Sequence, residues 1–291
     1  MKLGGNVLHF SPRYTAVLVT GVALAAASLG SAGVAQAAYE DPTMSLPRAT
    51  SGTPDLGPHF PYVQVIPIGG VVPLKDEAII NRSENGYLFR AGQQDSDLTV
   101  SITSGRLHFT DTGTRSWKWL PKRCHAVDVP QGVRASCRIP ARFTVAEPML
   151  LEIWPRLGDD VIDTSSLPTR FDVSVLGDEG DDVVHLGAGN DFVNGAQDMD
   201  HVYGGEGRDW IRTGIGDDFI DGGDGDDYLV GVEDDDTIYG GPGDDRIYGS
   251  DGNDEHFAGD GHDAVSCGNG ADTATLKATD STSGCEDRKL S

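Results

Sequence analysis

Apolar and polar residues alternate with a fixed nine-residue period between residues 177 and 275. Eleven consecutive units fill this segment without an insertion or deletion. The eighth position is Val, Ile or Leu in nine of them, with His256 and Ala274 as the exceptions. One large apolar residue between two mixed neighbours suits a very short strand whose middle side chain points inward. The pattern therefore predicts an all-β array of three-residue strands separated by turns.

Two further columns accompany the apolar one. The fourth position is glycine in nine units and aspartate in two (Asp198 and Asp234), which predicts a tight turn with positive φ in each unit. Stacked coils would pair the short strands in parallel at ~4.8 Å and join the apolar column into one interior. The sixth position is always aspartate: Asp182, Asp191, Asp200, Asp209, Asp218, Asp227, Asp236, Asp245, Asp254, Asp263 and Asp272.

Units such as GGDGDDYLV (222–230) and GGPGDDRIY (240–248) follow the pattern G-G-x-G-x-D-x-U-x. Residues 177–275 therefore resemble the RTX, or hemolysin-type, calcium-binding repeats, and the resemblance covers 99 of 291 residues. It implies a parallel β-roll in which two units make one coil and units eighteen residues apart stack directly. It also implies that several Ca²⁺ ions lie between successive turns, with the eleven aspartates as metal ligands.

The distribution of charge agrees with a cation-binding role. The eleven units contain 27 Asp and Glu against three basic residues, a net charge of −24, whereas the rest of the chain carries 19 acidic and 19 basic residues. Such close carboxylates repel one another unless cations lie between them, and calcium accepts many carboxylate and carbonyl oxygens. The spacing fits neither a helix-loop-helix calcium loop nor a structural zinc site. We expect the roll to be unfolded without calcium.

A disordered acidic tail is the alternative interpretation of this composition. Disorder would not require an aliphatic residue two places after each aspartate, so we expect this alternative to describe only the calcium-free state.

The register separates the turns into two rows. The even units all keep glycine at position 4, whereas the third and seventh units carry Asp198 and Asp234 there, at some conformational cost. We expect the even row to bind calcium best and the odd row to have weaker or missing sites around Asp200 and Asp236.

The first 37 residues have the features of a secretory signal peptide. Lys2 and Arg13 precede an apolar stretch at 14–27, and a small-residue cleavage site follows at 35–37. A membrane anchor is the alternative, but the stretch is short for a span of ~20 residues. The protein is expected to be secreted, with no membrane span after cleavage. An N-terminal signal resembles the secreted RTX proteins of actinobacteria rather than Gram-negative members, which use a C-terminal signal.

Four cysteines permit three pairings in a secreted chain. Proximity favours Cys124 with Cys137, closing a hairpin, and Cys267 with Cys285, tying the last repeat to the segment after it. Free thiols are the alternative.

The remaining segments are less regular. Residues 38–58 are a predicted linker, 59–154 a small β domain, 155–176 a degenerate first repeat and 276–291 a C-terminal cap. Strands are expected at 62–68, 98–102, 106–110, 143–145 and 150–154. In the degenerate repeat Asp160 takes the aspartate role, followed by a turn four residues longer than the eighteen-residue period before Asp182.

No catalytic motif was found in the β domain, and structural roles are favoured for His108 and His125. The sequence predicts a non-enzymatic, secreted calcium-binding protein with a structural or adhesive role and no nucleic-acid partner. The alternative is an extracellular calcium-dependent hydrolase with an unrecognised catalytic β domain. A glycan or cell-surface partner is suggested by two aromatic rows, while cross-strand stabilisation is the alternative for them. The rows are Phe192, Trp210 and Tyr228 on one side, and Tyr203, Tyr239 and Phe257 on the other.

Overall fold

The computed structural model describes residues 76–92 and 94–290. The predicted signal peptide at 1–37, the linker at 38–58 and the expected strand at 62–68 lie outside the described residues. The described residues form strands and contain no helix, so the predicted all-β class is confirmed. None of this part of the chain could therefore cross a membrane as a helix.

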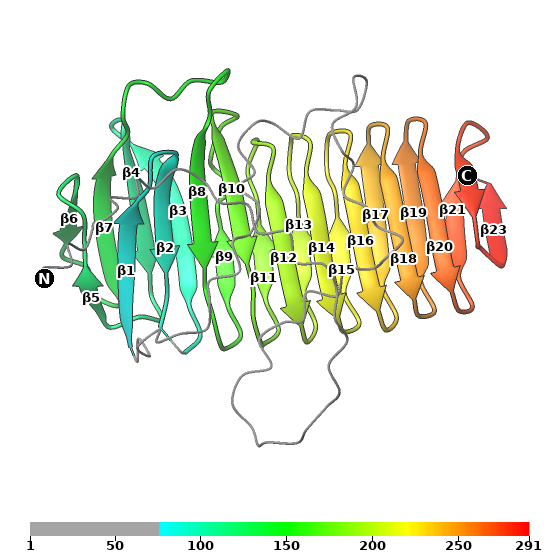
Figure 1. The fold of residues 1–291 in the computed structure, drawn as a ribbon, viewed down its shortest axis with the longest axis horizontal. Helices are drawn as coiled ribbons and strands as arrows, with labels where there is room; N and C mark the ends of the chain where they lie inside the picture. Colours follow the sequence, from blue (N-terminus) through cyan, green and yellow to red (C-terminus); the bar gives the residue numbers. More distant parts are fainter. Residues whose placement is uncertain (1–75, 93, 291) are drawn as a thin grey trace, which may run out of the picture. The chain divides into compact units, whose positions relative to one another are not determined.

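Two sheets contain all the strands of the described residues (Figure 1). Sheet 1 has eleven strands in the spatial order β5 (Ser116–Trp119), β1 (Glu77–Arg82), β2 (Gly86–Arg90), β8 (Met149–Trp154), β10 (Phe171–Leu176), β12 (Phe192–Gln197), β14 (Trp210–Ile215), β16 (Tyr228–Glu233), β18 (Arg246–Asp251), β20 (Ala264–Asn269) and β22 (Ser281–Ser283).

Sheet 2 has twelve strands and alternates with sheet 1 along the chain from β8 onward. Its spatial order is β6 (Cys124–Val127), β7 (Val133–Arg138), β4 (Arg106–Asp111), β3 (Asp97–Thr103), β9 (Val161–Asp163), β11 (Val183–His185), β13 (His201–Tyr203), β15 (Phe219–Asp221), β17 (Thr237–Pro242), β19 (Glu255–Asp260), β21 (Thr273–Leu276) and β23 (Asp287–Leu290).

The chain from β8 to β23 is a parallel β-solenoid of about 8 turns over residues 149–290. Strands eighteen residues apart pair in parallel, as Ile211 does with Leu229 in sheet 1 and Ile220 with Ile238 in sheet 2. The predicted stacking of alternate units is confirmed. The predicted strand length is wrong for most strands, because pairing continues into the first three positions of the next unit, as in β16.

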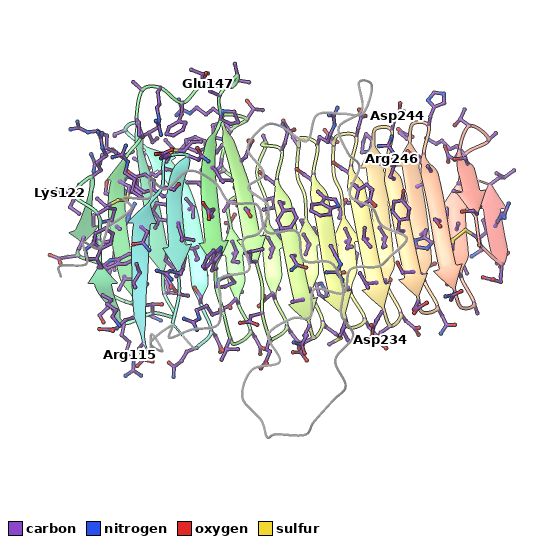
Figure 2. All side chains as sticks on the ribbon, in the orientation of Figure 1. Arg115, Lys122, Glu147, Asp234, Asp244 and Arg246 are labelled. Atoms are coloured by element: carbon purple, nitrogen blue, oxygen red, sulfur yellow. A yellow bond between two sulfur atoms is a disulfide. The ribbon has the colours of Figure 1, made fainter. Side chains whose placement is uncertain are left out.

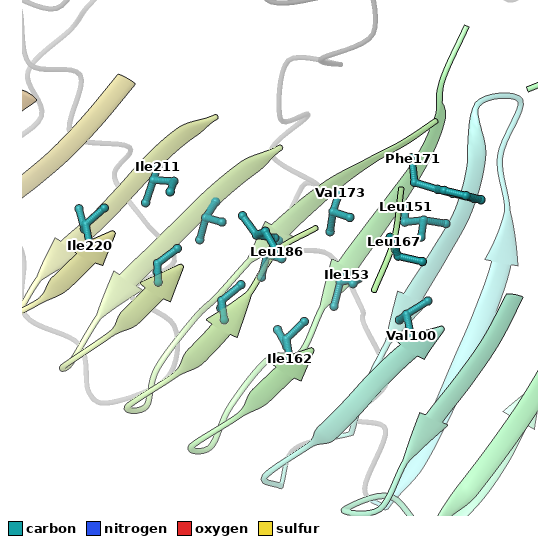
Figure 3. Close-up of a cluster of buried hydrophobic side chains, with 14 of the residues drawn as sticks. Val100, Leu151, Ile153, Ile162, Leu167, Phe171, Val173, Leu186, Ile211 and Ile220 are labelled. Atoms are coloured by element: carbon teal, nitrogen blue, oxygen red, sulfur yellow. The ribbon is translucent and has the colours of Figure 1, made fainter. Parts of the chain in front are cut away.

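Position 8 of every unit points into the space between the sheets. Its Val, Ile and Leu side chains are at most 2% exposed and form one cluster that continues into the N-terminal strands (Figure 3). His256 and Ala274 occupy the same column, and both are buried. One apolar residue per unit is therefore enough to build a continuous core, because each is covered by its neighbours in the adjacent coils.

The N-terminal strands extend the same two sheets. β2 pairs in parallel with β8, and β3 with β9, while β3, β4, β7 and β6 continue as antiparallel neighbours. The strands expected at 98–102, 106–110 and 150–154 correspond to β3, β4 and β8. The one expected at 143–145 is wrong, since this segment lies in the irregular connection between β7 and β8.

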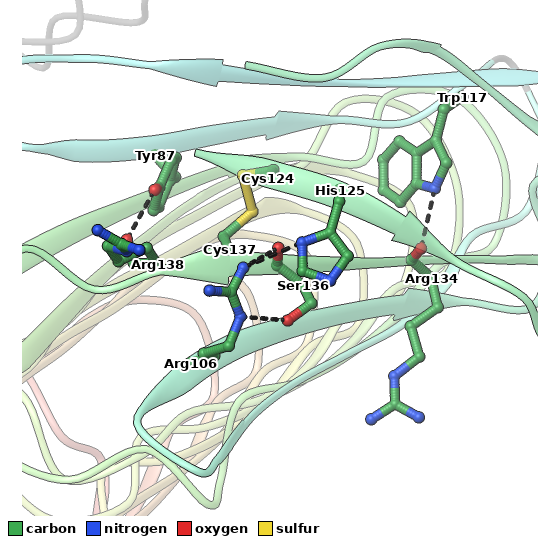
Figure 4. Close-up of a disulfide and its surroundings, with 9 residues drawn as sticks. All are labelled: Tyr87, Arg106, Trp117, Cys124, His125, Arg134, Ser136, Cys137 and Arg138. Carbon is green, nitrogen blue, oxygen red and sulfur yellow. Dashed lines mark hydrogen bonds between the residues drawn. A yellow bond between two sulfur atoms is a disulfide. The ribbon is translucent and has the colours of Figure 1, made fainter. Parts of the chain in front are cut away.

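Disulfides lie near both ends of the described structure, with the pairing expected from sequence proximity. Cys124 and Cys137 join β6 to β7 (Figure 4), and Cys267 joins β20 to Cys285 beyond β22. The last strand of sheet 2, β23, is exposed throughout and carries Arg288 and Lys289. Charged side chains on an edge strand discourage pairing with another chain.

Candidate metal centre

The turns that precede the strands form two rows, one at each edge of the roll. Asp234, from the seventh unit, and Asp244, from the eighth, lie at opposite edges in Figure 2. Odd units lead into strands of sheet 2 and even units into strands of sheet 1. Each row therefore brings together residues that are eighteen apart in sequence.

The position-6 aspartates form a hydrogen-bonded ladder in each row. The backbone N–H of one aspartate donates to Oδ1 of the aspartate one coil later, at 2.7 to 3.1 Å. The even ladder begins with a bond of 2.7 Å from the N–H of Val173 to Asp191. All eleven aspartates are at most 3% exposed. Stacking thus gathers them into two buried columns of carboxylates.

At the N-terminal end, the odd ladder continues through Asp160, as the degenerate repeat predicted. The N–H of Asp160 donates to Asp182, and Asp160 in turn accepts from the N–H of Ser96. The hydroxyl of Ser96 donates to the buried carboxylate of Asp111, which also accepts a bond from the hydroxyl of Thr114. The ladder therefore ends on a carboxylate with several protein donors.

At the C-terminal end, two acidic residues outside the repeats continue the ladders. The N–H of Asp263 donates to Asp280 at 3.3 Å, and the N–H of Asp272 donates to Oε2 of Glu286 at 3.0 Å. Sequence reasoning missed both residues because they lie 17 and 14 residues after their partners, outside the eighteen-residue period. The available signal was two acidic residues in the segment that follows the last unit.

The second carboxylate oxygen is the unusual feature of these columns. Oδ2 is buried without a hydrogen-bond partner in Asp160 and in ten of the eleven repeat aspartates, Asp182 being the exception. Burial, as the largest cause, raises the pKa of Asp200 and Asp236 to about 9 and that of Asp227 to about 7. Neighbouring aspartates raise the pKa of Asp200 further. A buried, unpaired carboxylate oxygen is costly unless a cation or a proton satisfies it.

Side chains alone do not form a cage. Among residues 76–92 and 94–290, no three His, Cys, Asp or Glu side chains come together as a group that could hold a metal ion. A cation between coils would therefore take part of its ligands from backbone carbonyls, which calcium accepts readily.

In the units that have glycine at position 1, the aspartate of the same unit leaves no room for a side chain there. A Cβ at Gly195 would lie 1.9 Å from Oδ2 of Asp200, and one at Gly222 would lie 2.7 Å from Oδ2 of Asp227. Atoms cannot approach so closely, so a side chain there would displace the carboxylate. The sequence shows this column of small residues only in part, because Leu186 and Thr213 also occur at position 1.

Position 4 explains why units 3 and 7 differ. Gly225 has φ +150°, and a Cβ there would lie 1.4 Å from the carbonyl oxygen of Gly207 in the adjacent coil. Asp198 and Asp234 instead adopt φ 69° and 75°, in the left-handed region that aspartate tolerates. The third and seventh turns therefore have a different backbone path from their glycine counterparts.

The comparison with protein families gives overlapping matches over these coils. The RTX calcium-binding nonapeptide repeat, described as four copies, matches residues 174–202, 194–229, 203–238, 221–255, 230–265 and 239–274. Residues 174–274 are RTX repeats. This part of the chain is therefore a calcium-binding β-roll. Neither the curated proteins nor the solved structures contain a match to the chain.

The residues of the RTX roll fit calcium by their chemistry. Each inner coil offers a carboxylate whose Oδ1 is already oriented by a backbone N–H, while Oδ2 has no partner. Hard oxygen ligands held in this way suit Ca²⁺, which tolerates irregular geometry better than Mg²⁺.

Aromatic side chains line the strands in two rows, as predicted. In sheet 1, Phe192, Trp210 and Tyr228 have ring centroids 4.8 and 6.1 Å apart. In sheet 2, Phe219, which was not part of the predicted row, lies between Tyr203 and Tyr239, at 5.5 Å from each. The rings of Tyr239 and Phe257 are stacked at 4.3 Å with an interplanar angle of 5°. The other named pairs are tilted, at interplanar angles of 42° to 59°. Contacts between rings on neighbouring strands support the alternative that these rows stabilise the ladder.

Proposed function

We propose that this is a secreted calcium-binding protein whose RTX roll folds when it meets extracellular Ca²⁺. The observation that carries the proposal is the column of buried aspartate Oδ2 atoms without partners. In the calcium-free chain these carboxylates would be buried beside one another, at a cost that the short strands do not offset. Calcium would remove that cost, so metal binding and folding would occur together.

The proposed ligands are the eleven aspartates from Asp182 to Asp272, together with backbone carbonyls of the turns. Within this set, the even row is proposed to bind best. Its units keep glycine at position 4, whereas Asp198 and Asp234 change the odd turns. The proposal places the weakest sites around Asp200 and Asp236.

The extracellular location is supported by two features. Residues 1–37 have the composition of a signal peptide. Two disulfides, Cys124–Cys137 and Cys267–Cys285, suit an oxidising compartment. We further propose a structural or adhesive role. The depression beside the first disulfide is lined by four arginine and lysine residues, by His125 and by the disulfide-bonded Cys124. It contains no carboxylate or free thiol, and so gives no support to the hydrolase alternative.

The test is a calcium titration of the full chain followed by far-ultraviolet circular dichroism, with magnesium as the control. Isothermal titration calorimetry gives the number of ions bound. The proposal requires a cooperative gain of β structure with calcium and not with magnesium. An equal response to both ions, or β structure already complete in a chelator, would contradict it.

A further inference from the structure

The N-terminal strands of sheet 2 carry a cluster of cations on their outer face. Arg106 on β4 is directly opposite Arg138 on β7 in the antiparallel register. Arg138 also donates its backbone N–H to the carbonyl of Arg123, the residue before β6. His125 lies opposite Ser136. Like charges placed opposite each other in a β ladder are destabilising. This arrangement therefore costs stability unless an anion lies close to the two guanidinium groups.

These cations surround a depression. Its lining consists of Arg106, Lys122, Arg123, Cys124, His125 and Arg138, and its volume is about 490 Å³. Within the described residues, none of its four arginine and lysine side chains forms an ion pair. The acidic roll therefore does not neutralise this end of the protein.

The depression is held in shape by the first disulfide and by a network around Ser136 (Figure 4). The guanidinium of Arg106 donates to Oγ of Ser136 at 2.7 Å and to its carbonyl at 2.8 Å. It also lies 3.1 Å from Nδ1 of His125. A guanidinium can only donate, so Nδ1 accepts and the proton of neutral His125 is on Nε2. The ring therefore keeps an N–H for another acceptor.

We propose that this basic depression binds a sulfate or phosphate oxyanion, either as the free ion or as an ester group on a polymer. Arginine presents several N–H donors in a planar fork that matches such oxygens, and converging cations strengthen each bond. Arg123 and Arg138 are the principal ligands, because both side chains are exposed at the rim while that of Arg106 is engaged with Ser136. This inference rests on the proposed function, because that proposal places the protein outside the cell. It adds a second ligand besides calcium.

The test measures binding of sodium sulfate, sulfated dextran and unsulfated dextran to the full chain in calcium-saturated buffer by isothermal titration calorimetry. Arg123→Gln/Arg138→Gln is the test variant, and Arg115→Gln/Lys118→Gln is the matched control with the same change in charge. Arg115 and Lys118 pair with Asp76 and Glu77, away from the depression. We expect the test variant to lose at least tenfold in affinity and the control to change less than twofold.

Comparison of the three ligands distinguishes a free anion from a sulfated polymer. Equal affinity for sodium sulfate and for the sulfate groups of dextran identifies the free ion, and binding of sulfated dextran alone identifies a polymer. No binding of either, or equal loss in test and control variants, would overturn the inference. Circular dichroism of the same samples separates it from the calcium proposal, because a roll that folds with calcium but binds no sulfate contradicts only the anion site.

Discussion

The backbone N–H of Asp160 donates a 2.9 Å hydrogen bond to Oδ1 of Asp182, twenty-two residues later in the chain. The regular coils make the same bond across eighteen residues. The longer loop between Asp160 and Asp182 is therefore accommodated without breaking the ladder, and the degenerate repeat functions as the first member of the odd row. The same hydrogen bond links successive aspartates in both rows.

Asp227→Asn should raise the calcium concentration needed for folding by about tenfold, or ~1.4 kcal/mol. The substitution removes a carboxylate whose Oδ2 is buried and unpaired. Asp236→Asn should have a smaller effect, because its row contains the altered turn at Asp234. The midpoint of a calcium titration followed by circular dichroism measures both. Asp224→Asn is the control, since its side chain is exposed in the same unit. Equal shifts for all three variants would contradict the assignment of ligands.

The calcium-free roll should become more stable as the pH falls. Burial raises the pKa of Asp218 to about 6, of Asp227 to about 7 and of Asp236 to about 9, against an ordinary value of 3.8. Between the ordinary value of 3.8 and these raised values, the folded chain holds more protons than the unfolded chain. The stabilisation by protons is therefore complete below the ordinary value and is lost as the pH rises through the raised values. Protons would then compete with calcium.

Circular dichroism in a chelator from pH 8 to pH 5 checks this dependence. It should show a gain of β structure on acidification, while calcium affinity measured over the same range should fall. Light scattering at each pH controls for aggregation, since the isoelectric point is about 4.4. A calcium-free chain that loses β structure on acidification would refute the prediction.

His256→Leu should stabilise the calcium-bound roll by about 1–2 kcal/mol. Both ring nitrogens of His256 are buried without partners in the apolar column, and burial lowers the pKa of this histidine to about 4. Leucine fills a similar volume without unpaired polar atoms. Thermal unfolding in saturating calcium measures the change. His256→Ala is the comparison and should destabilise because it leaves a cavity. Destabilisation by leucine would show that the ring makes a polar contact.

Asp280→Asn/Glu286→Gln should loosen the last coil. These two side chains accept the hydrogen bonds from the backbone N–H groups of Asp263 and Asp272. No repeat aspartate lies one coil further along either row to accept them. Hydrogen exchange should accelerate in β21 and β22, with an increase of about tenfold for the loss of ~1.4 kcal/mol. Protection in the central coils should not change. Asp287→Asn is the control, because its side chain is exposed on β23. Unchanged exchange in β21 and β22 would exclude a capping role.

The structure of the repeat region could be predicted from the sequence because single positions of the nine-residue unit determine the strand face and the turn. The apolar residue at position 8 fixes the inward face, and the period fixes the stacking of Ile211 on Leu229. Cys267 and Cys285 pair as proximity suggested. A periodic pattern of this kind can be recognised in the sequence without any knowledge of tertiary contacts.

The ends could not be predicted in the same way. β1 and β2 were not foreseen, because the pairing of β1 with β5 and of β2 with β8 depends on contacts with distant strands and not on a local period. The hairpin of β6 and β7 was foreseen, because Cys124 and Cys137 lie close together in the sequence. The roles of Asp280 and Glu286 depend on an irregular return of the chain after β21. The cluster of Arg106 and Arg138 also required the antiparallel register, since these residues are 32 positions apart.

The coil spacing has a consequence for how such a protein can change over generations. Asp209 bonds to Asp227 and Asp227 to Asp245 in the same way, so removing residues 222–239 would bring Asp209 directly onto Asp245 with the register preserved. Duplication of eighteen residues would lengthen the roll equally well. Deletion or duplication of eighteen codons in the gene can therefore change the number of coils by one, while both ends of the protein stay intact.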